Sequence, residues 1–183
     1  MAIHIALLRG VNLGSHRRVA MADVRGALAA EGFDGVATHL QSGNVVLRSP
    51  LAPTEVGRTI ERSLAERLGL TTTVIVRSPE ELAAAIDADP FRAIATDPAR
   101  HVLGFLSAAP EPRARADVER IIAGLPADGD RHAFAGAHFY LWCPNGISSS
   151  PYFKVRWDLL GVGVTQRNWN TATALLHMAD GPD

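Results

Sequence analysis

The sequence is poor in cysteine and in long apolar runs. Cys143 is the single cysteine, so an internal disulfide is excluded, and an isolated thiol is typical of a reducing compartment. No stretch reaches the roughly 18 apolar residues that a membrane span requires, and the N-terminus lacks a basic segment followed by a cleavable apolar one. We therefore expect a cytoplasmic protein with no membrane partner, no metal and no cofactor.

The sequence also lacks an excess of one charge. Its 18 basic and 19 acidic residues give a net charge of −1, which excludes a general attraction to nucleic acid or membranes. Any basic surface must be local, and four arginines do lie among the first thirty residues: Arg9, Arg17, Arg18 and Arg25. Since Lys154 is the only lysine, arginine is the default cation of this chain and does not by itself indicate an anion site.

The first half of the chain predicts an α+β unit. Met21, Val24 and Leu28 repeat at helical spacing, and Ser78–Glu81 is a capping box. The expected elements are a strand at 2–8, a helix at 20–31, strands at 36–41 and 44–48, a helix at 54–68, a strand at 72–76 and a short helix that ends near Asp89. Gly32 and Gly69 are expected to end the first two helices. This order is that of a ferredoxin-like unit.

The second half is expected to repeat the β-α-β-β-α order without visible sequence identity. The expected elements are a strand at 101–108, a helix at 113–123, two strands around Ala135-Gly136, a helix at 152–160 and a closing helix at 168–178. The fold prediction is therefore α+β, with two similar ferredoxin-like subdomains at 1–91 and 101–183, a linker at 92–100 and a C-terminal helix.

A turn signal separates the second and third predicted strands. Ser42-Gly43 predicts a two-residue hairpin that pairs Leu40 with Val45 and Thr38 with Leu47. This register decides which side chains share each face of the sheet.

The opposite face of this hairpin would carry polar side chains. Gln41 and Asn44 would flank the turn on the same face as His39 and Arg48. If the helices cover the other face, this one is either open to a ligand or an ordinary solvated surface.

The connection after the first strand, Arg9–Arg18, is the main candidate site. Backbone N–H groups in a glycine-containing loop between a strand and a helix can face an anion. The alternative is a turn in which Gly10 and Gly14 take positive φ and the arginines are solvated. Neither a Walker A motif nor a dinucleotide-binding motif is present. The candidate ligand-binding residues of this loop are Arg9, Gly10, Asn12, Gly14, Arg17 and Arg18.

The segment Arg167–Thr171 is expected to begin the closing helix. Asn168 would be its N-cap and Trp169 would enter the core. Arg167, Asn170 and Thr171 would then be left for a second anion site, because the first turn of a helix has free N–H groups. We expect this segment to face the Arg9–Arg18 loop across a composite pocket.

Several motifs of the chain resemble those of the domain-of-unknown-function family 1697. They are Leu7–Gly14, Met21, Gly32-Phe33, Gln41–Val46, Asp89–Phe91 and Arg167–Thr171. The chain departs from the family pattern at Ser15, where a glycine is usual, and at Gln166, where a threonine is usual. The resemblance implies a small bacterial α+β protein with two similar subdomains and no assigned activity.

Three classes of function stay open. The first is a binding protein for a phosphate-bearing or other anionic ligand, held by the Arg9–Arg18 loop. The second is an enzyme acting on such a ligand, for which His39 is the nearest acid–base candidate. The third is a protein-interaction module without a small ligand. The first three predicted strands contain no aromatic residue, which argues against nucleic-acid binding by base stacking.

Overall fold

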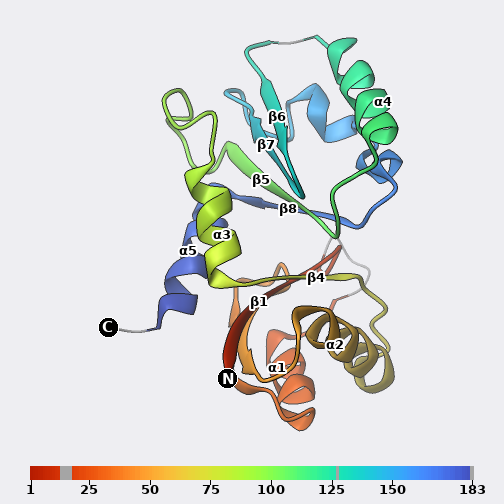
Figure 1. Cartoon of the computed structure of the whole chain (residues 1–183), viewed down its shortest axis with the longest axis vertical. Coiled ribbons are helices and arrows are strands. Elements are labelled where there is room, and N and C mark those ends of the chain that lie inside the picture. The colour runs from red at the N-terminus through yellow and green to blue at the C-terminus, as the bar shows by residue number, and fades with distance from the viewer. Residues whose placement is uncertain (13–17, 127, 182–183) are drawn as a thin grey trace. The chain divides into compact units, whose positions relative to one another are not determined.

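The computed structural model describes residues 1–12, 18–126 and 128–181. These residues form two four-stranded antiparallel sheets and five α-helices (Figure 1). The chain divides into two compact units. Unit 1 comprises Met1–Ala84 and Thr173–Asp183, and unit 2 comprises Ala85–Ala172. No helix in the described ranges is long and apolar enough to cross a membrane.

Unit 1 contains the first sheet and two of the helices. Its elements are β1 (Ala2–Leu8), α1 (Met21–Ala30), β2 (Asp34–His39), β3 (Asn44–Ser49), α2 (Pro53–Leu68) and β4 (Val74–Arg77). The strand order is β2-β3-β1-β4, and every neighbouring pair is antiparallel. Helix α3 (Pro79–Asp87) follows β4, and its predicted capping box is confirmed by two reciprocal bonds between Ser78 and Glu81.

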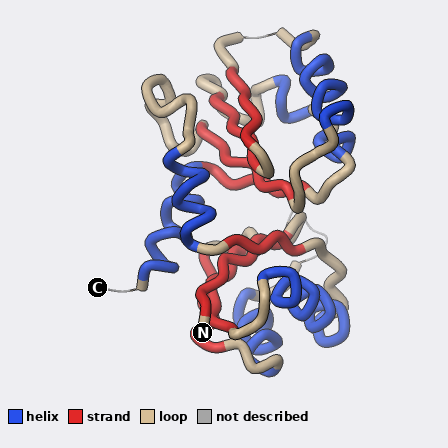
Figure 2. The backbone as a smooth tube through the Cα atoms, in the orientation of Figure 1, coloured by secondary structure: helices blue, strands red, loops and turns tan. Residues whose placement is uncertain are grey.

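The core of unit 1 is almost entirely aliphatic. Helices α1 and α2 lie side by side on one face of the sheet (Figure 2). The predicted stripe of Met21, Val24 and Leu28 is buried there, against residues such as Leu47. Burying each such side chain contributes roughly 1.5–3 kcal/mol. The predicted helix ends at Gly32 and Gly69 are confirmed, with φ of +83° and +62°.

Unit 2 contains the second sheet. Its elements are β5 (His101–Leu106), α4 (Pro112–Ala123), β6 (Arg131–Ala135), β7 (His138–Trp142), two 3₁₀ helices η1 (Pro151–Lys154) and η2 (Trp157–Leu160), and β8 (Val164–Asn168). Helix α5 (Trp169–Asp180) begins in unit 2, and from Thr173 on it belongs to unit 1. The strand order is β6-β7-β5-β8, again antiparallel. It matches the order in unit 1, with η1 and η2 at the place that α2 takes there.

The core of unit 2 is rich in aromatic side chains. Phe139 is fully buried and stacks on Trp157, with the ring centroids 4.3 Å apart. A Cβ atom at Gly104 would overlap the Phe139 ring, so the glycine makes room for the stack. Aromatic rings thus fill space beside the sheet that two short 3₁₀ helices leave open.

Two predictions about the end of the chain are wrong and one is confirmed. The single helix predicted at 152–160 is two 3₁₀ helices, and strand β8 was not predicted at all. Asn168 is confirmed as a helix cap, because its Oδ1 accepts a hydrogen bond of 3.0 Å from Thr171 N. Arg167 therefore lies in a strand, pairing with Leu103 of β5, and not in the first turn of α5.

The predicted register of the β2–β3 hairpin is also wrong. Thr38 pairs with Val45 and His39 with Asn44, so the turn has four residues, Leu40–Gly43. The side chain of Asn44 closes this wider turn by donating to His39 O at 2.9 Å and to Ser42 Oγ at 2.9 Å.

The division between the units falls within α3, whereas the sequence predicts a linker at 92–100. One residue before that segment and one within it make hydrogen bonds inside unit 2. Tyr140 Oη donates to Ala85 O at 2.7 Å, and Trp169 N donates to Pro98 O at 3.1 Å. These contacts tie the stretch 85–100 to β7 of the second sheet and to the start of α5.

Candidate functional site

Three connections of unit 1 meet beyond the end of β1, at what we call the loop end of unit 1. They are the β1–α1, β2–β3 and α2–β4 connections. Leu8 N donates to Gly43 O at 2.8 Å, and Arg9 N donates to Thr73 O at 3.0 Å. Thr72 Oγ1 donates to Arg9 O at 2.8 Å. The backbone of Arg9 is therefore fixed on both sides, while its side chain is exposed.

Asn12 joins two of these connections through its side chain. Its Nδ2 donates to Val19 O at 3.1 Å and to Gln41 O at 2.6 Å, and its Oδ1 accepts from Val19 N at 2.8 Å. Its φ of +57° is tolerated by asparagine better than by most residues. Asn12 thus closes the base of the β1–α1 connection and holds it against the β2–β3 turn.

Gly43 allows the turn to approach β1 closely. Its φ is +74°, and a Cβ atom there would lie 2.7 Å from Leu8 Cβ and 3.3 Å from Val11 Cβ. Both the positive φ and this contact require glycine. The close contact between the β2–β3 turn and the end of β1 therefore depends on glycine at position 43.

The structure brings most of the predicted ligand residues of unit 1 to this end. Arg9, Gly10 and Asn12 belong to the junction, and Gln41 is exposed on the β2–β3 turn. Asn44 is fully buried and its side chain supports the turn. Arg18 lies just before α1, whereas Gly14 and Arg17 lie outside the described residues.

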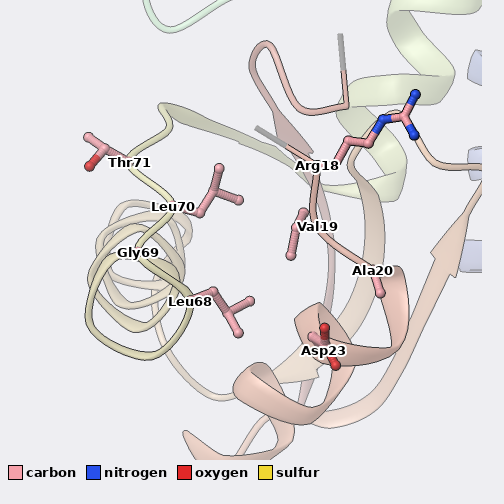
Figure 3. Close-up of a pocket in the computed structure, with 8 residues that line it drawn as sticks. All are labelled: Arg18, Val19, Ala20, Asp23, Leu68, Gly69, Leu70 and Thr71. Carbon is pink, nitrogen blue, oxygen red and sulfur yellow. The ribbon is translucent and has the colours of Figure 1, made fainter. Parts of the chain in front are cut away.

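A hollow of about 410 Å³ lies between the start of α1 and the end of α2 (Figure 3). The aliphatic side chains of Val19, Leu68 and Leu70 line it, and Asp23 in the first turn of α1 lies at one side. The Arg18 side chain extends away from the two leucines. Aliphatic side chains thus contribute to the hollow, but more of its exposed lining is polar than apolar.

The sheet face opposite α1 and α2 is not the open polar surface that the sequence allows. Ile5, Leu7 and Ile75 on that face are at most 2% exposed, and Val46 is 6% exposed. Arg48 is exposed and His39 is half-buried, at the margin of the sheet. His39 therefore lies beside the β2–β3 turn, at the edge of a buried face.

Arg167 is a buried arginine. Its Nη1 donates to Thr165 Oγ1 at 2.8 Å and to Gln166 O at 2.7 Å. Burial lowers the pKa of its guanidinium to about 10, so it stays protonated at neutral pH. Thr171 is also buried, and Asn170 is exposed. Arg167 belongs to unit 2 and Arg9 to unit 1, and the composite pocket stays a prediction.

A buried cluster in unit 2 was missed by sequence reasoning. His101 Nε2 lies 3.2 Å from Asp89 Oδ1, although the two are not aligned for a hydrogen bond. The His101 ring stacks on Trp169 at 4.1 Å, and Phe91 approaches its edge. Burial lowers the pKa of His101, and the nearby Asp89 carboxylate opposes this shift.

Two motifs that carry the family resemblance meet at this cluster. Asp89 and Phe91 come from one, and Trp169 comes from the other. His101, at the start of β5, contacts residues of both motifs and was not identified from the sequence. Because the cluster is buried, these residues hold the start of β5 to the start of α5.

Cys143 lies in a second buried cluster of unit 2. Burial raises the pKa of its thiol to about 11, so the thiolate needed for nucleophilic chemistry is scarce at neutral pH. The neighbouring Ser150 donates from Oγ to Asp130 and accepts from Tyr152 N, as the cap of η1. Across the described part of the chain, no three His, Cys, Asp or Glu side chains are grouped to hold a metal ion.

Comparisons with known proteins bear on the fold and on the family of the chain. A solved structure, the conserved bacterial protein SP0830 from Streptococcus pneumoniae, superposes with a TM-score of 0.74 at 21% sequence identity. The alignment covers 97% of this chain and 98% of that one, which shows a common fold. No curated protein matches the chain. Residues 1–140 match the family described as "Protein of unknown function (DUF1697)". This match covers most of the sequence, and the chain therefore belongs to the DUF1697 family.

Proposed function

We propose that the protein binds a phosphate-bearing or other anionic small ligand at the loop end of unit 1. The observation that carries the proposal is the fixed backbone of Arg9, which is hydrogen-bonded through both its N–H and its C=O while its side chain stays exposed. A guanidinium on a fixed backbone loses less conformational freedom when it pairs with an anion.

A second arginine and the side-chain bonds of Asn12 support the same site. Arg18 is exposed at the far end of the β1–α1 connection, and Asn12 ties that end to the start through Val19. Charge-assisted bonds from arginines to phosphate or carboxylate oxygens are about twice as strong as neutral ones. Because Asp23 borders the hollow, we expect the anionic group on the side of the arginines and away from that carboxylate.

We further propose that the two units are both ferredoxin-like and arose by duplication. The matching strand orders and the matching position of β5, α4, β6, β7 and β8 relative to the elements of unit 1 support this. The single, buried Cys143 supports a cytoplasmic location, and the neighbour from a bacterium supports a bacterial origin.

The test is a calorimetric titration of the purified protein with inorganic phosphate, sulfate, sugar phosphates and nucleotides. We expect at least one anion to bind, and Arg9→Ala to weaken that binding about tenfold while the protein stays folded. Arg113→Ala, which removes an exposed arginine of unit 2, is the matched control and should leave the affinity unchanged. No binding of any anion, or equal losses in both variants, would refute the proposal.

A further inference from the structure

We infer that the protein forms a dimer in which strand β6 of one copy pairs antiparallel with β6 of a second copy. The two four-stranded sheets would then join into one continuous sheet, with a two-fold axis at Ala133. The inference concerns a surface of unit 2 and is independent of the proposed ligand site at the loop end of unit 1.

The outer side of β6 carries unpaired backbone groups. Strand β6 lies at one edge of its sheet, and no strand of the described residues pairs with its outer side. In the β6–β7 turn, Ala137 O accepts a hydrogen bond from the last residue of β5. Successive residues of β7 bond to opposite neighbours, so those in register with Ala133 and Ala135 bond to β6. The alternate residues of β6, His132 and Phe134, therefore direct their N–H and C=O groups outward.

Strand β6 also lacks a feature that protects the corresponding edge strand of unit 1, β2. The register of β2 with β3 shifts between Asp34 and Ala37, and Gly35 has a φ of +59°. Such a bulge turns an edge strand away from further pairing. In contrast, the five residues of β6 pair with β7 in unbroken register. The outer edge of β6 is thus regular, and its backbone groups match those of another extended strand.

The sequence of β6 fits a second copy of itself. Only a register centred on Ala133 pairs all five residues of the strand, and it places the outward-facing His132 opposite the partner's Phe134. Both rings are half-buried, on the face of the sheet that α4 covers. Pairing them would bury more of each ring, and aromatic cross-strand pairs stabilise a sheet. On the other face, Arg131 lies opposite the partner's Ala135, so that the two arginines do not meet.

A hollow of about 300 Å³ lies beside β6 on the face that α4 covers. The end of α4 and Tyr152 line it together with Arg131 and His132, and more of its exposed lining is apolar than polar. Residues that face each other in a hydrogen-bonded antiparallel pair have Cα atoms about 5.5 Å apart. The partner's Phe134, opposite His132, would therefore lie at the rim of this hollow. A second copy thus brings an apolar ring to an apolar surface.

The first measurement is the molar mass by light scattering during size-exclusion chromatography, over a series of protein concentrations. Five residue pairs form a small interface, so we expect a reversible dimer that is populated at about 100 µM and dissociates on dilution. The mass should rise from the 19.5 kDa of one chain towards twice that value. A monomer at every concentration up to about 1 mM would overturn the inference and leave this edge to an extended segment of another protein.

Charge at position 133 tests whether β6 forms the interface. Ala133→Glu and Ala133→Lys each place like charges beside each other at the two-fold axis, so each variant alone should be monomeric. An equimolar mixture of the two should dimerise again, because the facing charges are then opposite. Ala37→Glu, at a half-buried position of the edge strand β2, is the matched control and should leave the dimer intact. An Ala133→Glu dimer as stable as that of the wild type would overturn the inference.

Charge at position 135 tests the register. Ala135 is exposed, so substitutions there should leave the fold intact, which circular dichroism checks. Ala135→Glu places a carboxylate opposite the partner's Arg131 and should tighten the dimer about two- to tenfold, because two equivalent pairs form. Ala135→Arg should weaken it by a similar factor. An unchanged dissociation constant in both variants would overturn the inference, even if a charge at the half-buried position 133 prevents folding.

Discussion

The central strands of the two units, β1 and β5, end in the same way. In each, one backbone N–H donates to the neighbouring hairpin turn and the next donates to the residue before the edge strand. The donor–acceptor pairs are Leu8–Gly43 and Arg9–Thr73 in unit 1, and Leu106–Ala137 and Ser107–Gly163 in unit 2. The strand order alone accounts for these bonds, because it places the same neighbours beside the end of each central strand.

The side chains at the ends of these two strands differ between the units. Unit 1 has the exposed Arg9 where unit 2 has Ser107, whose Oγ accepts a hydrogen bond from Gly163 N at 2.8 Å. The unit 1 connection runs on to Arg18 and is closed by Asn12, whereas α4 of unit 2 begins at Pro112. The side chain at this position is therefore hydrogen-bonded to its own unit in unit 2, whereas in unit 1 it is an exposed cation.

The two cores differ as much as the two loop ends. Unit 1 packs aliphatic side chains beneath two long helices, and unit 2 packs stacked rings beneath one helix and two 3₁₀ helices. A similar arrangement of strands is therefore stabilised in two ways. Each way can be disrupted separately, which allows the comparison to be tested.

The largest effect is expected for Phe139→Ala in unit 2. The ring is fully buried and stacked on Trp157, so its loss should lower the free energy of unfolding by about 3–5 kcal/mol in a urea titration. Gly104→Ala should also destabilise the protein, by about 1–3 kcal/mol, because its methyl group meets the Phe139 ring.

The two substitutions should not be additive. Once Phe139 is alanine, the methyl group at position 104 has room, and Gly104→Ala should then cost less than about 1 kcal/mol. Additive losses would show that the aromatic stack does not set the size of residue 104.

A smaller effect is expected at the hairpin turns. Gly43→Ala should lower the free energy of unfolding by about 2–4 kcal/mol, since it combines a positive φ with a contact against Leu8. Gly136→Ala is the matched control in unit 2, because φ is +55° there and nothing lies near its Cβ position. It should cost only about 1 kcal/mol. Equal losses would mean that the close approach of the turn to β1 adds no requirement for glycine.

Local patterns predicted the helices better than the turns. The stripe of Met21, Val24 and Leu28 and the capping box at Ser78 are signals contained within one segment. The β2–β3 register is not, because the Leu8–Gly43 bond and its close contact come from a strand more than thirty residues away. Ser42-Gly43 fits the sequence preference of a two-residue turn, but the turn in the structure has four residues.

Local sequence patterns were limited in a similar way in predicting the candidate site. The glycine and arginine pattern drew attention to the Arg9 connection, and the structure brings Gln41, also a candidate from the sequence, against it through Asn12. Strand β8 was missed because its polar residues, Gln166–Asn168, do not look like a sheet interior. Its pairing with β5 buries Arg167, which the sequence predicts at a ligand site. The burial of Arg167 depends on which strand β8 pairs with, and the local sequence does not indicate that partner.

The smallest expected effect is the pH dependence of unit 2. Burial lowers the pKa of His101 below its ordinary value of 6.5, so the unfolded chain takes up the proton first as the pH falls. The contribution of His101 to stability is therefore complete above pH 6.5. It is lost as the pH falls from 6.5 through the lower pKa of the folded protein. The slope is at most about 1.4 kcal/mol per pH unit.

His101→Gln tests this effect in urea titrations at a series of pH values between 5 and 7.5. Glutamine keeps an N–H donor near Asp89 but does not titrate, so the free energy of unfolding should vary less steeply below pH 6.5 than in the wild type. His132, whose pKa burial also lowers, accounts for part of the remaining slope. An unchanged slope in His101→Gln would show that the cluster joining Asp89, His101 and Trp169 stabilises unit 2 without any coupling to protons.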